Sequence, residues 1–163
     1  MGVDIHMSII KGNKFIKEDI FSGRNSEWFR NLQGEGWEDE YDHFPSCWGI
    51  PEDAPEKIKK AFDKSDDGYY GFNYIEAGAF CEWFNKYRPD LKAGWVSTYD
   101  KWRMEKKGYI PEDPPHYLDP EDRIDDMHFI EYQDKYDCSL WLYNYLLDNE
   151  IYADAVIVYY FDC

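Results

Sequence analysis

The stretch Ala155-Val156-Ile157-Val158-Tyr159-Tyr160-Phe161 decides the fold of this chain. Its β-branched and aromatic residues predict a strand that is buried on both faces, and therefore a central strand of a sheet. At the opposite end, residues 3–9 alternate apolar and polar side chains, which is typical of a half-buried strand. The sequence Lys11-Gly12-Asn13-Lys14 offers a turn, after which residues 15–17 return as a second strand. We therefore expect an N-terminal β-hairpin that shares one sheet with the C-terminal strand.

Helical patterns occupy much of the chain between these strands. The expected helices run from about 26 to 33, 54 to 64, 74 to 87, 98 to 107 and 138 to 147. Asp53 and Asn73 are expected to cap the second and third helices, and Asp137 or Ser139 the last one. Four of the eight prolines fall between 111 and 120, where they exclude a helix. The sequence therefore predicts a single α+β domain over residues 1–163, with an acidic, Pro-rich surface loop at about 110–120.

The charge of the chain is strongly negative and unevenly distributed. Asp and Glu number 34 against 18 Lys and Arg, which gives a net charge of -16. Aromatic residues make up 20% of the chain, enough for a folded core and unlike a disordered acidic chain. From residue 109 to the end, fourteen acidic residues face only Arg123 and Lys135, so this third of the sequence carries -12. Whatever the charge serves, it is concentrated in the C-terminal third.

The four cysteines and the hydropathy place the chain in a reducing compartment. Cys47, Cys81, Cys138 and Cys163 are far apart and form no C-x-x-C pair, so neither a zinc ribbon nor a disulfide framework is indicated. We expect reduced thiols, most of them buried. No segment has the roughly 18 consecutive apolar residues of a membrane helix. The expected location is the cytoplasm of a bacterial host, with no membrane association.

Short motifs along the whole chain resemble a family of uncharacterised phage and prophage proteins. They are the opening Met-Gly-Val-Asp-Ile-His, then Gly23-Arg24-Asn25, then 49–53, and the closing Tyr160-Phe161-Asp162, in the order the family has them. Family members begin Met-Gly-Cys-Asp-Ile-His and end in a strand closing with Phe-Asp-Asn. This chain departs from that pattern at Val3, at Cys163 and at 67–72, where a His-rich stretch is usual. The resemblance implies a phage context and supplies no mechanism.

Asp4 and His6 form the first candidate site. They are two residues apart and therefore share one face of the first strand. If the last strand pairs antiparallel with the first, Asp162 falls near the same edge. An imidazole with two carboxylates can hold a divalent metal or activate a water. His43 is a candidate for a further ligand, but we favour a loop histidine on the acidic surface. The other interpretation is structural: Asp4 bonds a turn backbone, and His6 is a partly buried residue beside a carboxylate. The sequence leaves both open.

Arg24 and Asn25 form a second candidate, an anion-binding site. They follow Gly23 just before the first expected helix, where backbone N–H groups and a guanidinium can receive a phosphate. No Gly-rich phosphate-binding run accompanies them. We therefore favour a simple helix start, with Arg24 paired to a nearby acid.

The helix expected at 98–107 combines basic and aromatic residues, a composition that can bind single-stranded nucleic acid. Its basic residues are Lys101, Arg103, Lys106 and Lys107, beside Trp95, Tyr99 and Trp102. A body of charge -16 repels nucleic acid, and Asp100 and Glu105 stand at salt-bridge spacing. We therefore expect an internally paired helix face and no direct binding of duplex DNA.

The acidic, tyrosine-rich C-terminal third is the preferred site. Carboxylates steer a basic partner, and tyrosines add contact area. The alternative is a solvated face that only keeps the protein soluble. The expected binding residues are Asp113, Tyr117, Asp119, Glu121, Asp122, Asp125, Asp126 and Tyr132.

These observations favour a binding protein over an enzyme. We expect an acidic phage-type inhibitor of a basic host nucleic-acid-binding protein, an anti-defence or anti-CRISPR protein that mimics nucleic acid and needs no cofactor. The alternative is a metal-assisted hydrolase or a nucleotide-binding protein that uses Asp4, His6 and Asp162, with a divalent metal as its cofactor and Arg24 as the anion contact.

Overall fold

The computed structural model describes residues 2–25, 28, 32, 44–64, 68–108 and 125–162. The fold is α+β, as expected. The chain divides into two compact units, one formed by Met1–Tyr87 with Leu142–Cys163 and the other by Arg88–Trp141. The expected loop at 110–120 lies outside the described residues.

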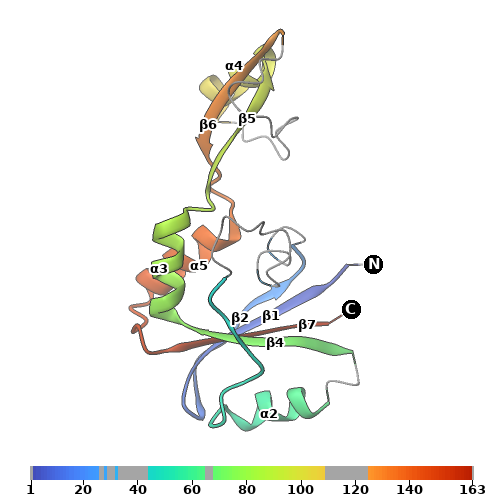
Figure 1. Ribbon diagram of the computed structural model, residues 1–163, viewed down its shortest axis with the longest axis vertical. Coiled ribbons are helices and arrows are strands. Elements are labelled where there is room, and N and C mark those ends of the chain that lie inside the picture. Colours follow the sequence, from blue (N-terminus) through green and yellow to red (C-terminus); the bar gives the residue numbers. More distant parts are fainter. Residues whose placement is uncertain are drawn as a thin grey trace. The chain divides into compact units, whose positions relative to one another are not determined.

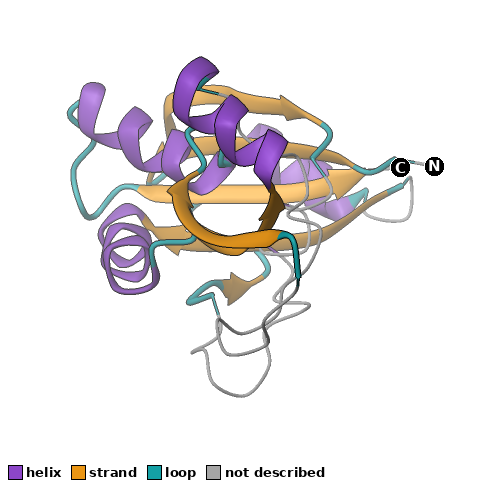
Figure 2. Ribbon diagram, turned by 90° about the horizontal axis from the view of Figure 1, so that it is seen from above, coloured by secondary structure: helices purple, strands orange, loops and turns teal. Residues whose placement is uncertain are grey.

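The first unit is built on a five-stranded antiparallel sheet of order β2-β1-β7-β4-β3. The strands are β1 (Asp4–Lys11), β2 (Lys14–Gly23), β3 (Cys47–Trp48), β4 (Tyr69–Glu76) and β7 (Val156–Asp162). The N-terminal hairpin and the C-terminal strand therefore share one sheet, and β7 is its central strand, as the sequence predicted. The two termini lie at the same end of this sheet (Figure 2).

The described helices of this unit lie on both sides of the sheet (Figure 1). On one side are α3 (Ala77–Tyr87) and α5 (Cys138–Asp148), which belongs to this unit from Leu142 onward. Phe84 of α3 stacks on Tyr143 of α5 with ring centroids 4.5 Å apart. On the other side, α2 (Glu56–Asp63) buries Ile58 against Ile10 and Val158. Burial on both faces explains why β7 is so apolar.

Strand β4 replaces the start of an expected helix. We predicted a helix over 74–87 with Asn73 as its cap, but residues 69–76 form a strand and α3 begins only at Ala77. The pairing of Tyr74 with Val158 and of Ile75 with Ile157 stabilises the strand. Local capping is worth about 1 kcal/mol, so a paired and packed strand outweighs it. The expected Asp53 cap is also wrong, because α2 starts after Pro55 without a side-chain cap.

The second unit is a two-stranded antiparallel ribbon with a helix against it (Figures 1 and 2). Strand β5 (Leu91–Ser97) pairs along its whole length with β6 (Met127–Gln133), and neither strand was expected from the sequence. Helix α4 (Thr98–Lys107) was expected with these bounds. Ser97 Oγ accepts a hydrogen bond from the Asp100 backbone N–H at 3.1 Å, and Gly108 ends the helix in the left-handed conformation (φ 65°).

A buried carboxylate holds the base of this ribbon together. Asp90 is fully buried and accepts two hydrogen bonds from Arg88, at 2.9 and 2.7 Å, and one from Gln133 at 2.9 Å. Burial alone would raise the pKa of Asp90, but the bonds from Arg88 and Gln133 outweigh it and hold the pKa below its ordinary value. Beside it, Lys92 pairs with Asp134 at 2.9 Å. These contacts join the start of β5 to the end of β6.

Cys47, Cys81 and Cys138 are free thiols. Cys47 is exposed and the other two are half-buried, so the expectation that most thiols are buried is wrong. In the described part of the chain, none of the helices has the length and apolar character needed to cross a membrane.

Candidate functional site

The sheet brings Asp4, His6 and Asp162 together at the end where the termini lie. Asp4 is directly opposite Asp162 in the β1–β7 pairing, and His6 Nε2 lies 2.7 Å from Asp162 Oδ2. The side chains of His6 and Asp162 are 22% and 30% exposed, so solvent reaches the pair. The conditional expectation that an antiparallel last strand would place Asp162 beside the D-x-H pair is confirmed.

Aromatic rings surround this histidine. The His6 ring stacks on Tyr160 at 5.0 Å between centroids and meets the edge of Tyr69 at 6.2 Å. Tyr160 in turn stacks on Phe72 at 4.6 Å. Burial and the neighbouring Tyr69 raise the pKa of the Tyr160 hydroxyl, so this phenol stays protonated at neutral pH. The imidazole is therefore held in one orientation by a carboxylate on one side and a ring on the other.

This arrangement can orient an imidazole for proton transfer, because a carboxylate bonded to one ring nitrogen fixes the position of the other. Across the described ranges, no group of three or more His, Cys, Asp or Glu side chains is arranged to hold a metal ion. His43 lies outside the described residues. The cluster is thus an imidazole–carboxylate pair with a second carboxylate beside it.

Arg24 and Asn25 are both engaged within the protein. Arg24 Nε donates to Asp4 Oδ1 at 2.6 Å. Asn25 Oδ1 accepts a hydrogen bond from the Trp28 backbone N–H at 2.9 Å, and Trp28 is helical. This is the geometry of a helix N-cap beside an ion pair, the arrangement that we favoured over an anion site.

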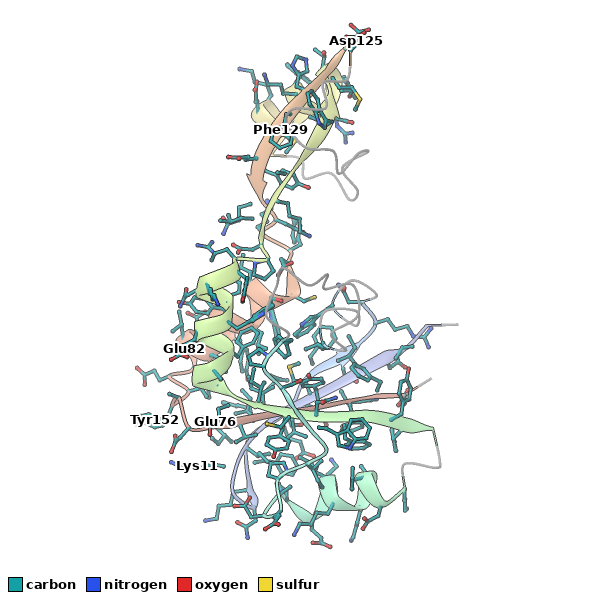
Figure 3. The ribbon with its side chains drawn as sticks, in the orientation of Figure 1. Lys11, Glu76, Glu82, Asp125, Phe129 and Tyr152 are labelled. Carbon is teal, nitrogen blue, oxygen red and sulfur yellow. The ribbon has the colours of Figure 1, made fainter. Side chains whose placement is uncertain are left out.

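The expected acidic binding residues fall into two sets. Five of them lie outside the described residues: Asp113, Tyr117, Asp119, Glu121 and Asp122. Asp125 and Asp126 are exposed in the turn before β6, and Figure 3 shows Asp125 at the tip of the ribbon. Tyr132 is a half-buried residue of β6. The described carboxylates of the expected set, Asp125 and Asp126, therefore lie together at one end of the β-ribbon.

A groove runs between helix α4 and strand β6. Its volume is about 400 Å³. Its lining residues are Lys101, Met104, Glu105, Gly108, Lys135 and 130–133. Ile130, Tyr132 and Met104 give it an apolar part. Its charged lining residues are two acids and two bases: Glu105, Glu131, Lys101 and Lys135. A side chain with an apolar stem and a charged head matches this lining.

Two of the four basic residues of α4 pair with acids of the same helix, as expected. Lys101 lies 4.0 Å from Glu105, and Arg103 lies 3.7 Å from Asp100. Tyr99 and Trp102 are exposed and stack on each other at 6.1 Å. Neighbouring acids therefore neutralise part of the basic character of the helix.

Comparisons with known proteins identify no relative: no protein-family model, no curated protein and no solved structure matches this chain.

Sequence reasoning did not predict strand β6, although Tyr132, which lines the groove from this strand, was among the expected binding residues. The stretch Met-His-Phe-Ile-Glu-Tyr-Gln at 127–133 is rich in β-branched and aromatic residues, a signal that could have identified the strand. Its partner β5 contains Gly94 and Ala93, which are poor strand formers, so β5 gave almost no signal.

Proposed function

We propose that this protein acts by binding, as a phage-type inhibitor of a basic host nucleic-acid-binding protein. The observation that carries the proposal is the net charge of -16 and its distribution. The described residues hold 21 of the 34 acidic side chains and 16 of the 18 basic ones. Most of the surplus charge therefore belongs to the segments 26–43, 65–67 and 109–124. Solubility alone needs only dispersed charge, so this concentration favours recognition of a positively charged partner.

Three exposed acids in β6 and in the turn before it support the same proposal. Asp125, Asp126 and Glu131 are exposed, and no described Lys or Arg forms an ion pair with them. Carboxylates that stay hydrated in the free protein attract a basic surface at long range. A nucleic-acid-binding cleft in a host defence enzyme has this chemistry, because it is built to receive polyanions. Occupying such a cleft would block the natural substrate.

The test compares two variants of equal charge. The first neutralises Asp119, Glu121, Asp122, Asp125 and Asp126 to Asn or Gln. The second neutralises five exposed acids of the first unit: Glu52, Glu56, Asp63, Glu76 and Glu82. Immobilised wild-type protein should capture a nucleic-acid-binding host protein and inhibit it, and the complex should weaken steeply between about 0.05 M and about 0.5 M salt. Duplex DNA should compete for the captured protein.

The two variants separate a local site from a general effect of charge. The first variant should lose capture and inhibition, whereas the second should retain most of both. Equal losses in the two variants would reduce the proposal to non-specific charge attraction. Tight binding that survives the first set of substitutions would overturn it.

The pair formed by His6 and Asp162 favours a second candidate, a hydrolase or nucleotide-binding protein centred on Asp4, His6 and Asp162. Calorimetric titration with Mn²⁺, Zn²⁺ and a panel of nucleotides tests it. Saturable binding that disappears in His6→Ala would support this candidate. If none of the metals or nucleotides gives a heat of binding, this candidate is excluded.

A further inference from the structure

Strand β6 has an outer backbone edge that faces away from β5. Among the described strands, β6 pairs only with β5 and β5 only with β6. Each strand therefore has a second backbone edge with no described strand beside it. An open strand edge presents a row of N–H and C=O groups to which another chain can add.

One hydrogen bond fixes which backbone groups of β6 face outward. The Asp134 N–H donates to the Asp90 carbonyl at 2.7 Å, which makes these two residues a hydrogen-bonded pair of the antiparallel ladder. Because such pairs alternate with non-bonded ones, Tyr132 and Ile130 bond across to β5. Glu131 and its neighbours two residues away, Phe129 and Gln133, direct their N–H and C=O groups away from β5. These three residues define the outer edge of β6.

The charge along this edge decides what it can accept. From Asp125 to Asp134 the chain has four acidic residues and no Lys or Arg. A second copy of β6 would bring like charges opposite one another, which destabilises a strand pair. Asp134 is already paired with Lys92. An extended segment that carries Lys or Arg would instead meet the exposed carboxylates of Asp125 and Asp126 before the strand and of Glu131 within it. The α4–β6 groove beside the edge offers space for the apolar stems of such side chains.

We infer that β6 is a docking strand, on which an extended basic segment of a partner protein adds as a third strand of the β5–β6 ribbon. This inference rests on the proposed function and specifies how the basic partner is held. The backbone of β6 supplies affinity through main-chain hydrogen bonds, and the acids around it select Lys and Arg. Glu131 contributes to both affinity and selectivity, because its backbone N–H and C=O face outward and its carboxylate is exposed.

The test uses a fluorescently labelled short peptide in which lysine alternates with threonine. Glu131→Pro removes one outward N–H from β6. Proline is tolerated where the N–H of an edge strand faces solvent, so the ladder with β5 is kept. Ala93→Pro is the matched control, because Ala93 pairs with Glu131 and its N–H faces outward from the other edge of the ribbon. Glu131→Gln removes the charge alone and keeps the amide.

The docking strand predicts a different result for each variant. Peptide affinity, measured by fluorescence anisotropy, should fall about tenfold or more in Glu131→Pro, which corresponds to the loss of about one main-chain hydrogen bond. It should fall only about two- to threefold in Glu131→Gln and stay unchanged in Ala93→Pro. Wild-type affinity in Glu131→Pro would overturn the inference that β6 is a docking strand. A loss of affinity in Ala93→Pro equal to that in Glu131→Pro would overturn it as well.

Two further peptides keep the test decisive if Glu131→Pro does not fold. Methylation of alternate backbone nitrogens should abolish binding to the wild-type protein, and unchanged affinity would contradict strand addition. Replacement of each lysine by glutamate should also abolish binding, and equal affinity would contradict a basic partner.

The outcomes distinguish the two proposals. If the partner protein binds and is inhibited but Glu131→Pro has no effect on it, the docking strand is wrong and the proposed function stands. If no basic protein binds the wild-type chain, the proposed function fails whatever the peptides show.

Discussion

Replacement of Asp90 by Ala should destabilise the protein markedly, because this carboxylate is fully buried and accepts three side-chain hydrogen bonds. Removal of one partner from a buried ion pair costs about 3–5 kcal/mol. The Arg88 side chain is 39% exposed, so its guanidinium regains water once Asp90 is gone. We therefore expect the lower end, about 3 kcal/mol. For a chain of this size, such a loss lowers Tm by roughly 6–12 °C.

Arg88→Ala provides a sharper test of the same reasoning. It leaves a fully buried carboxylate with Gln133 as its remaining side-chain donor, so it should cost more than Asp90→Ala, although Arg88 is the more exposed partner. Urea unfolding gives the free energies, and amide hydrogen exchange in β5 and β6 locates the loss. The control is Glu131→Gln, an exposed substitution expected to stay within about 0.5 kcal/mol. An Asp90→Ala protein as stable as this control would refute the reasoning.

Two further predictions follow from the same structure. The folded-state pKa of Asp90 is lowered, so the stabilising effect of its carboxylate is complete above about pH 4 and is lost as the pH falls through that lowered pKa. The difference in unfolding free energy between wild type and Asp90→Asn should therefore shrink below about pH 4. A difference that stays constant with pH would contradict a lowered pKa of Asp90. Gly71 and Gly108 have nearly equal φ angles of 66° and 65°, but a β-carbon meets the Phe161 ring only at Gly71. Gly71→Ala should therefore cost about 1–3 kcal/mol more than Gly108→Ala in thermal unfolding, and equal costs would exclude the steric explanation.

Local sequence patterns located those elements whose determinants lie within a few residues. The alternation at 3–9 and the apolar run at 155–161 identified the terminal strands, because burial on one or two faces leaves a direct trace in the sequence. Helix α4 was recognised between Ser97 and Gly108, since caps are made by neighbouring residues. The meeting of Asp4, His6 and Asp162 also followed, once the terminal strands were assumed to pair antiparallel.

Only the tertiary structure decided the remaining strands and the docking edge. Strand β4 overrides a local capping motif because it pairs with β7, and the paired residues are 80 to 93 positions apart. Strand β5 contains weak strand formers and exists because β6 pairs with it and because Asp90 joins its base to Gln133. The outward direction of the Glu131 amide depends on the phase of that pairing, which the Asp90–Asp134 backbone bond sets. Contacts between distant residues leave no periodicity in a sequence, and they determine where this protein offers a strand edge to a partner.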